Sequence, residues 1–187
     1  MTGLLLLSGG QSRRMGEPKH ALAHPEGGTW GGHLVRAFEA ACPVGPVVVL
    51  GEALPDRPTL PRLDDPREGP AIALAHWCAT PAPPEDRWWL VACDQVRWTP
   101  DRLVAWLRRV EVADPLAAHW VMAEHGGRLQ PLGGVLAGSL RALIAGSGER
   151  SLTRLALAVP HLVLPATGPE WLDLDTPEDR RAFEAGQ

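Results

Sequence analysis

Short apolar runs that alternate with amphipathic segments constrain the fold of this chain more than any other feature. The runs at residues 3–7, 47–50 and 88–92 contain almost no polar side chains, as expected of strands buried on both faces of a parallel sheet. Residues 33–41 and 70–80, which lie between these runs, place apolar side chains at helical spacing. Strands that alternate with helices predict a three-layer α/β/α, Rossmann-like sandwich with a mostly parallel sheet.

The second half of the chain continues this alternation with one difference. Thr99-Pro100-Asp101 and Thr176-Pro177 are helix-start signals, which predict one helix through residue 110 and another at the C-terminus. Residues 119–136 contain two apolar-rich runs around Gly126-Gly127, which predict an antiparallel hairpin inserted in the parallel sheet. Residues 161–164 and 171–174 are predicted to form short strands.

Length and composition bound the class of protein. The 187 residues, 45% hydrophobic and 21% charged, are predicted to form one domain, 1–187. A formal net charge of -4 argues against nucleic-acid binding, and no apolar run approaches the ~20 residues of a membrane span. Cys42, Cys78 and Cys93 share no metal-ligand spacing, so we expect reduced thiols in a cytoplasmic protein. The seven histidines contain no H-E-x-x-H motif, so zinc is not expected.

The loop after the first strand carries the clearest chemical signal. Its sequence SGGQSRRMGEPK, residues 8–19, combines a glycine pair with three cations. Glycines let backbone N–H groups approach a ligand, and the cations can neutralise phosphate. The loop matches neither the Walker A motif nor the dinucleotide motif G-x-G-x-x-G. Lys19 is the one lysine among 18 basic residues, which favours a specific role over a solvated surface charge.

These residues resemble the nucleotidylyltransferase signature L-[AS]-[AG]-G-x-S-x-R-M-G-x-x-K. Four further stretches, taken with the loop, resemble the molybdenum cofactor guanylyltransferase family from one end of the chain to the other. They are LDDPREGPAIAL at 63–74, VACDQVRWTPDRL at 91–103, QPLGGVL at 130–136 and WLDLDTPEDRRAF at 171–183. The agreement of five segments in order and spacing makes a chance match a poor explanation.

The resemblance implies a nucleotidyltransferase fold and a reaction. GMP would pass from GTP to the terminal phosphate of molybdopterin, with Mg²⁺ as cofactor and release of pyrophosphate. The implied partners are GTP, molybdopterin and acceptor molybdoenzymes. Arg14, Lys19 and Asp94 would be catalytic, with Asp94 the metal ligand, and Asp173 and Asp175 would lie on the pterin side. The implied nucleotide-binding residues are Leu7, Ser8, Gly9, Gly10, Lys19, Asp65 and Asp94.

Taken alone, the same carboxylates have simpler interpretations. An aspartate after a strand, such as Asp94, can cap a helix or a turn. Asp65 lies between Asp64 and Pro66, a combination typical of turns. Asp173 and Asp175 could belong to a solvated strand edge.

Three departures from the family pattern leave alternatives open. Val96 stands where the family usually has proline, and Leu50 stands where some members have a nucleotide-contacting asparagine. Asp173 and Asp175 occupy positions that are typically asparagine in guanylyltransferases, whereas D-[IL]-D-T-P-E-D is common in cytidylyltransferases and other relatives. The alternatives are cytidylyl transfer to the molybdenum cofactor and nucleotidyl transfer to a sugar or alditol phosphate. A carrier that binds GTP or the cofactor without turnover is a third reading, against which Lys19 and Asp94 argue.

Overall fold

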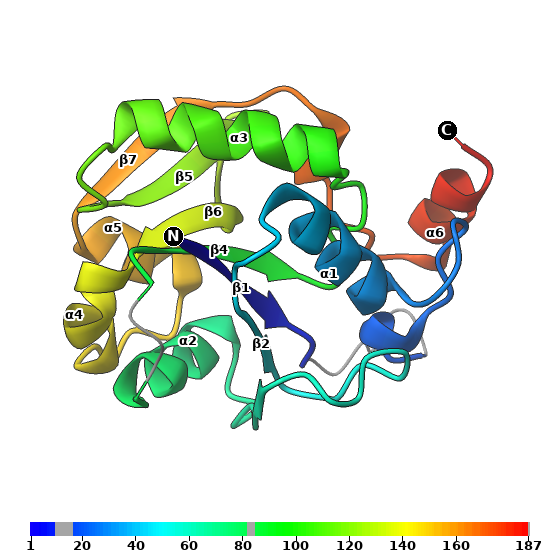
Figure 1. The fold of residues 1–187 in the computed structure, drawn as a ribbon, viewed down its shortest axis with the longest axis horizontal. Coiled ribbons are helices and arrows are strands. Elements are labelled where there is room, and N and C mark those ends of the chain that lie inside the picture. Colours follow the sequence, from blue (N-terminus) through cyan, green and yellow to red (C-terminus); the bar gives the residue numbers. More distant parts are fainter. Residues whose placement is uncertain (10–16, 82–84, 187) are drawn as a thin grey trace.

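The chain forms one mixed β-sheet in which all strands but one run in the same direction (Figure 1). The computed structural model describes residues 1–9, 17–81 and 85–186. The strand order is β3-β2-β1-β4-β6-β5-β7, and among these strands only β6 is antiparallel to its neighbours. The strands are β1 (Thr2–Leu7), β2 (Val47–Leu50), β3 (Arg62–Leu63), β4 (Arg87–Ala92), β5 (Trp120–His125), β6 (Arg128–Ala137) and β7 (His161–Pro165).

Helices cover both faces of the sheet. They are α1 (Trp30–Ala41), α2 (Pro70–Ala79), α3 (Pro100–Ala113), α4 (Arg141–Ala145), α5 (Leu152–Ala158) and α6 (Pro177–Glu184), with 3₁₀ turns η1 (Lys19–Ala21), η2 (Gly138–Leu140) and η3 (Pro169–Trp171). Side chains alternate along β1: Leu4 and Leu6 join a core with α1 and α3, whereas Leu5 and Leu7 join a core with α2, α4 and α5. The predicted three-layer sandwich is therefore confirmed.

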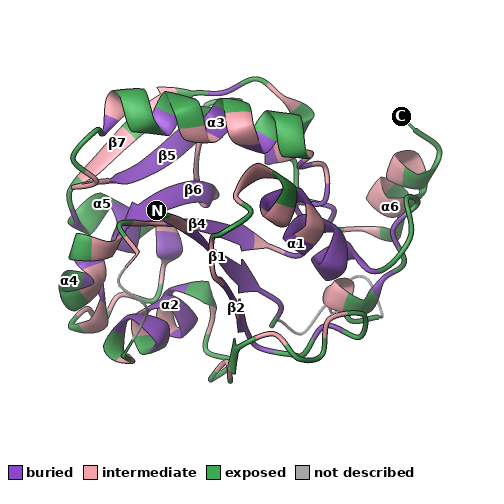
Figure 2. Cartoon of the chain, in the orientation of Figure 1, coloured by how far each residue is buried: buried purple, intermediate pink, exposed green. Residues whose placement is uncertain are grey.

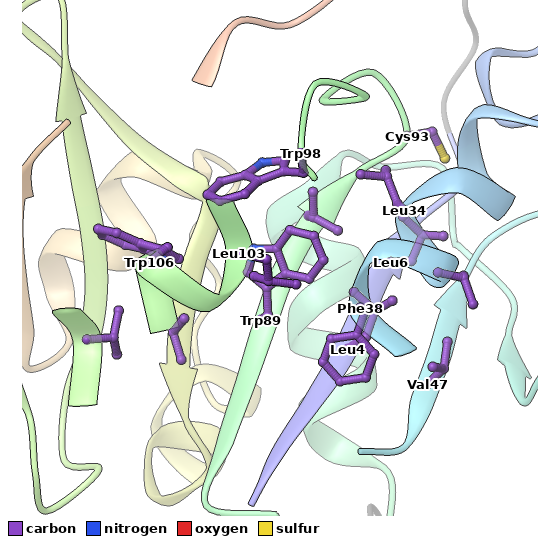
Figure 3. Packing of buried hydrophobic residues seen from close by; sticks show 14 of the residues in the cluster. Leu4, Leu6, Leu34, Phe38, Val47, Trp89, Cys93, Trp98, Leu103 and Trp106 are labelled. Atoms are coloured by element: carbon purple, nitrogen blue, oxygen red, sulfur yellow. The ribbon is translucent and has the colours of Figure 1, made fainter. Parts of the chain in front are cut away.

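Tryptophan fills much of the core beneath α1 and α3. Figure 3 shows Trp89 and Trp98 between the sheet and these helices, with the two rings edge to face at 5.4 Å. Trp171 packs edge to face against both Trp98 and Trp106 at 4.9 Å. Such contacts add to the free energy of burying large apolar surfaces. In Figure 2 the central strands β1, β2 and β4 are largely buried and β7 is mostly intermediate, whereas exposed residues lie on the outward faces of the helices and in the loops.

Most predicted elements are present, and one is not. The strands at 3–7, 47–50, 88–92 and 161–164, the hairpin and the C-terminal helix are confirmed. The strand predicted at 171–174 is wrong: Trp171 ends η3, and residues 172–174 lie in a loop. Insertion of the Trp171 ring into the core outweighs the strand propensity of this segment. Helix α1 begins three residues earlier than predicted, because the Thr29 hydroxyl accepts the N–H of Gly32 and caps the helix there.

The strand order changes direction at β1, which has β2 on one side and β4 on the other. From β1 the chain proceeds to β2 on one flank, whereas β4 lies on the other flank of β1. Ligands of open α/β sheets bind at the carboxyl ends of the strands next to such a reversal. Lys19 follows β1 and Asp94 follows β4, so both emerge there. No helix among the described residues has the length and apolar character needed to cross a bilayer.

Candidate functional site

Lys19 lies between two carboxylates that come from distant parts of the chain. Its Nζ is 2.8 Å from an oxygen of Asp94 and 2.7 Å from an oxygen of Asp175. The Lys19 and Asp94 side chains are mostly buried, whereas Asp175 is half exposed. We call Lys19, Asp94 and Asp175 the lysine–carboxylate cluster. It is a partly desolvated site in which one cation already holds two anionic groups together.

The charges in this cluster shift the pKa values of its members and of their neighbour. Burial lowers the pKa of Lys19, but Asp94 and Asp175 more than offset this effect and leave the pKa above its ordinary value. Partial burial and then the like charges of Asp94 and Asp175 raise the pKa of Asp173 to about 6. Because Asp173 keeps contact with solvent, we consider the neighbouring carboxylates the decisive cause.

Three separate elements position the cluster. Lys19 opens η1 directly after Pro18, whose fixed φ directs the chain into the turn. The segment beyond β4 is tied to β1, because the backbone N–H and the thiol of Cys93 both donate to the Leu7 carbonyl. Asp175 precedes Thr176, the N-cap of α6, and its backbone N–H donates to the Asp179 carboxylate of the capping box. The Leu174 N–H donates to the carbonyl of Asp94 and joins the last two elements.

A cleft of about 530 Å³ runs from the end of β1 toward β2 and β3. Gly9 borders this cleft, and a Cβ added at Gly9 would lie 2.1 Å from an Asp65 oxygen. Gly51, at φ +114°, approaches the Gly9 nitrogen so closely that a Cβ would lie 2.5 Å from it. Only glycine fits this crossing. The cleft is lined by Gly9, Pro18, His20, Gly51, Glu52, Arg62, Asp64, Asp65 and Arg67.

Besides Asp64, four titratable residues that line the cleft were not predicted as site residues. His20, Glu52, Arg62 and Arg67 come from a 3₁₀ turn, two loops and the edge strand β3. Arg67 donates to Glu52 at 2.7 Å, and Arg62 lies 3.2 Å from Asp64. Burial lowers the pKa of His20, so its ring is neutral at pH 7. Alternating donors and acceptors of this kind can pair with the polar edges of a nucleotide base.

The structure brings some predicted site residues together and gives others a different role. Lys19 meets Asp94 and Asp175, and Asp65 lies over Gly9. Leu7 is buried in the core. The Ser8 hydroxyl points inward and donates to the carbonyls of Leu50 and Glu52. The backbone N–H groups of Ser8 and Gly9 lie 2.8 and 3.2 Å from the Leu50 carbonyl. Gly10 and Arg14 lie outside the described residues.

Comparison with known proteins places the chain in a family. Residues 4–161 match the MobA-like NTP transferase domain, and the chain belongs to this family. It is therefore a nucleotidyltransferase. No curated protein sequence matches it significantly.

Solved structures share the fold over nearly the whole chain. Rv0371c from Mycobacterium tuberculosis H37Rv is 21% identical, with a TM-score of 0.71 over 99% of this chain and 98% of the other. Molybdopterin-guanine dinucleotide biosynthesis protein A from Archaeoglobus fulgidus is 16% identical, with a TM-score of 0.73 over 99% and 97%. A manganese complex of Rv0371c is 20% identical, with a TM-score of 0.66 over 100% and 98%. At these identities the likeness establishes the fold.

Proposed function

We propose that the protein transfers GMP from GTP to the terminal phosphate of molybdopterin, with formation of the guanine dinucleotide cofactor and release of pyrophosphate. The observation that carries this proposal is the lysine–carboxylate cluster at the carboxyl ends of β1 and β4, beside the cleft that Gly9 and Asp65 border. A triphosphate and a phosphate acceptor are both anions, so their reaction needs charge neutralisation and in-line positioning more than acid–base catalysis.

Residues of the cluster suit a divalent cation. The Lys19 ammonium stands between oxygens of Asp94 and Asp175, in the place that a cation between two carboxylates would take. Mg²⁺ prefers one or two carboxylates together with phosphates and water. We therefore assign Asp94 as the Mg²⁺ ligand, with Asp175 close enough to contribute. When bound, Mg²⁺ would withdraw charge from the phosphates of the nucleotide.

The transfer step needs little chemistry from the protein. An acceptor phosphate oxygen forms a bond to the α-phosphorus of GTP, and the bond from that phosphorus to the bridging oxygen breaks. Pyrophosphate leaves with the electron pair. Lys19, drawn from the carboxylates toward the more highly charged triphosphate, neutralises the leaving group, and Arg14 assists. Gly9 and Gly10 admit the phosphates, and Asp65 helps to fix the nucleotide.

Asp173 and Asp175 support a position for the acceptor next to the reacting phosphates. Asp175 touches Lys19, and Asp173 responds electrostatically to Asp94. A pterin-side role for these two residues therefore brings the acceptor phosphate to the lysine–carboxylate cluster. The same pair of carboxylates is the feature that favours the alternatives, cytidylyl transfer or transfer to a sugar or alditol phosphate.

A substrate survey tests the proposal directly. The purified protein is incubated with Mg²⁺, each of GTP, CTP and ATP, and either molybdopterin or a sugar or alditol phosphate as the acceptor. Both pyrophosphate and the nucleotidylated product are measured. We expect GTP to give the fastest Mg²⁺-dependent turnover. Equal or faster turnover with CTP would show that the protein transfers a cytidylyl group and not a guanylyl group. Turnover only with a sugar or alditol phosphate would replace the acceptor, and GTP binding without pyrophosphate release would make the protein a carrier.

A further inference from the structure

We propose that His24, Glu26 and His33 form a binding site for a divalent transition metal of the zinc type, separate from the Asp94 site. We call these three residues the histidine cluster. His24 and Glu26 lie in the loop between η1 and α1, and His33 lies in the first turn of α1. One potential ligand atom from each residue lies within 4.8 Å of the other two. Two imidazoles and a carboxylate are a common ligand set for zinc.

The orientation of His33 already suits a metal ligand. Its Nε2 lies 2.9 Å from the carbonyl oxygen of Trp98. A carbonyl only accepts hydrogen bonds, so Nε2 carries the hydrogen and Nδ1 keeps its lone pair. That Nδ1 is 3.6 Å from a carboxylate oxygen of Glu26, and a small closure would bring both atoms within ~2 Å of one ion. A ring N–H donated to a backbone carbonyl is the usual support of a metal-bound histidine.

The ring of His24 is held in the same way as that of His33. The residue is only 7% exposed. Its Nδ1 accepts the backbone N–H of Glu26, so in the neutral ring Nε2 carries the hydrogen, which interacts with the Val96 backbone. The lone pair that can bind an ion is therefore that of Nδ1. The Glu26 N–H must release this lone pair when a metal binds, and Glu26 is exposed enough to move.

Binding requires the two imidazoles to tilt. The rings of His24 and His33 are stacked 3.7 Å apart at 12°, and lone pairs in parallel ring planes do not converge on one ion. The three residues border a cavity of about 550 Å³, which gives the rings space to open. The Glu26 side chain is 74% exposed and can follow the ion. The cavity also leaves room for water at the remaining coordination position.

The ligand set selects a different metal from the one expected at Asp94. Imidazole nitrogen suits Zn²⁺, Co²⁺, Ni²⁺ and Cu²⁺, whereas Mg²⁺ prefers oxygen ligands. The sequence hides this site because His24 and His33 are nine positions apart. Gly27 and Gly28, at φ +94° and +73°, reverse the chain between them, and the His24 N–H donates to the Gly28 carbonyl. This turn, rather than helical spacing, brings the two histidines together.

Calorimetry and spectroscopy test the site without any assay of turnover. Metal-free protein in excess Mg²⁺, which occupies oxygen sites, is titrated with Zn²⁺ and separately with Co²⁺. We expect one equivalent of Zn²⁺ to bind, a rise in the melting temperature, and visible Co²⁺ bands typical of nitrogen ligation. Glu26→Gln, a change on an exposed turn, should weaken Zn²⁺ binding at least ~10-fold, and His33→Gln should weaken it more.

Glu184→Gln is the matched control, because Glu184 borders the same cavity but is not part of the histidine cluster. This variant should bind Zn²⁺ like the wild type. The proposal is overturned if the wild type binds no Zn²⁺ under these conditions. It is also overturned if Glu26→Gln and His33→Gln, shown to be folded by circular dichroism, bind Zn²⁺ as tightly as the wild type, because the ion would then sit elsewhere.

Discussion

The lysine–carboxylate cluster and the histidine cluster draw on the same stretch of chain, residues 19–33, yet they accommodate polar groups in opposite ways. Around Lys19 the ionisable groups keep their charges and neutralise one another. The ammonium lies 2.7–2.8 Å from oxygens of Asp94 and Asp175. Around His24, burial lowers the pKa and keeps two stacked imidazoles neutral. Carboxylate oxygens suit hard cations and the Lys19 ammonium suits phosphates, whereas neutral imidazole nitrogens suit softer metals. The difference follows from the partners that each group meets.

The largest loss of turnover is expected when Asp94 is changed. This substitution should affect the lysine–carboxylate cluster and leave the histidine cluster intact. Asp94→Asn removes a carboxylate from the lysine–carboxylate cluster while it preserves shape. Loss of a metal ligand worth several kcal/mol should reduce Mg²⁺-dependent turnover on the order of 10³-fold. Thermal stability and Zn²⁺ binding should stay near the wild-type values. Normal turnover across a Mg²⁺ titration would show that Asp94 is not the ligand.

Lys19 tests whether the geometry of the cation matters as well as its sign. Lys19→Ala should reduce turnover ~10²–10³-fold, the usual cost of losing one preorganised stabilising group. Lys19→Arg should fall between wild type and Lys19→Ala, because a planar guanidinium displaces the charge between Asp94 and Asp175. Steady-state rates at saturating GTP and Mg²⁺ measure both effects. Indistinguishable rates for the three proteins would show that Lys19 has no role in the reaction.

The histidine cluster should reveal itself in the pH dependence of stability. The pKa of His24 is about 4 in the folded protein and about 6.5 in the unfolded chain. Between these values the unfolded chain binds more protons, so the free energy of unfolding of metal-free protein should fall as the pH falls from 6.5 to 4. The loss is up to about 3 kcal/mol, at ~1.4 kcal/mol per pKa unit.

Denaturant unfolding at a series of pH values in the presence of a chelator measures this loss. His24→Gln should reduce the dependence, with His20 and His33 contributing the remainder, whereas the control His76→Gln, at an exposed position on α2, should keep it. An unchanged slope in His24→Gln would assign the pH dependence to other groups.

The smallest effect is expected at Asp175, where the lysine–carboxylate cluster opens to solvent. Its side chain is 52% exposed, and a solvent-screened ion pair contributes less than about 1 kcal/mol. Asp175→Asn should change stability by less than that amount and turnover by only a few-fold. Kinetics with varied acceptor and varied Mg²⁺ would show which interaction weakens. A loss as large as that of Asp94→Asn would make Asp175 an equal metal ligand.

The sequence by itself determined the layers and the edge of the sheet at which Lys19 and Asp94 lie. Continuous apolar runs at 3–7, 47–50 and 88–92 could only be strands buried on both faces, and their burial is complete or nearly so. Once β1 and β4 are parallel neighbours, the segments that follow them emerge at the same edge of the sheet, where Lys19 and Asp94 meet. Helix caps at Thr99 and Thr176 act locally and were readable for the same reason.

Only the tertiary structure decided which side chains complete each site. Trp171 enters the core and removes the strand expected at 171–174, yet the following loop still delivers Asp175 to Lys19. Glu52 and Arg62 reach the cleft because β2 and β3 lie side by side, and no local pattern encodes that placement. His24 and His33 meet through a glycine turn, and burial lowers the pKa of both rings. Burial and charge depend on contacts between distant segments, whereas periodicity and capping depend on neighbours in the chain.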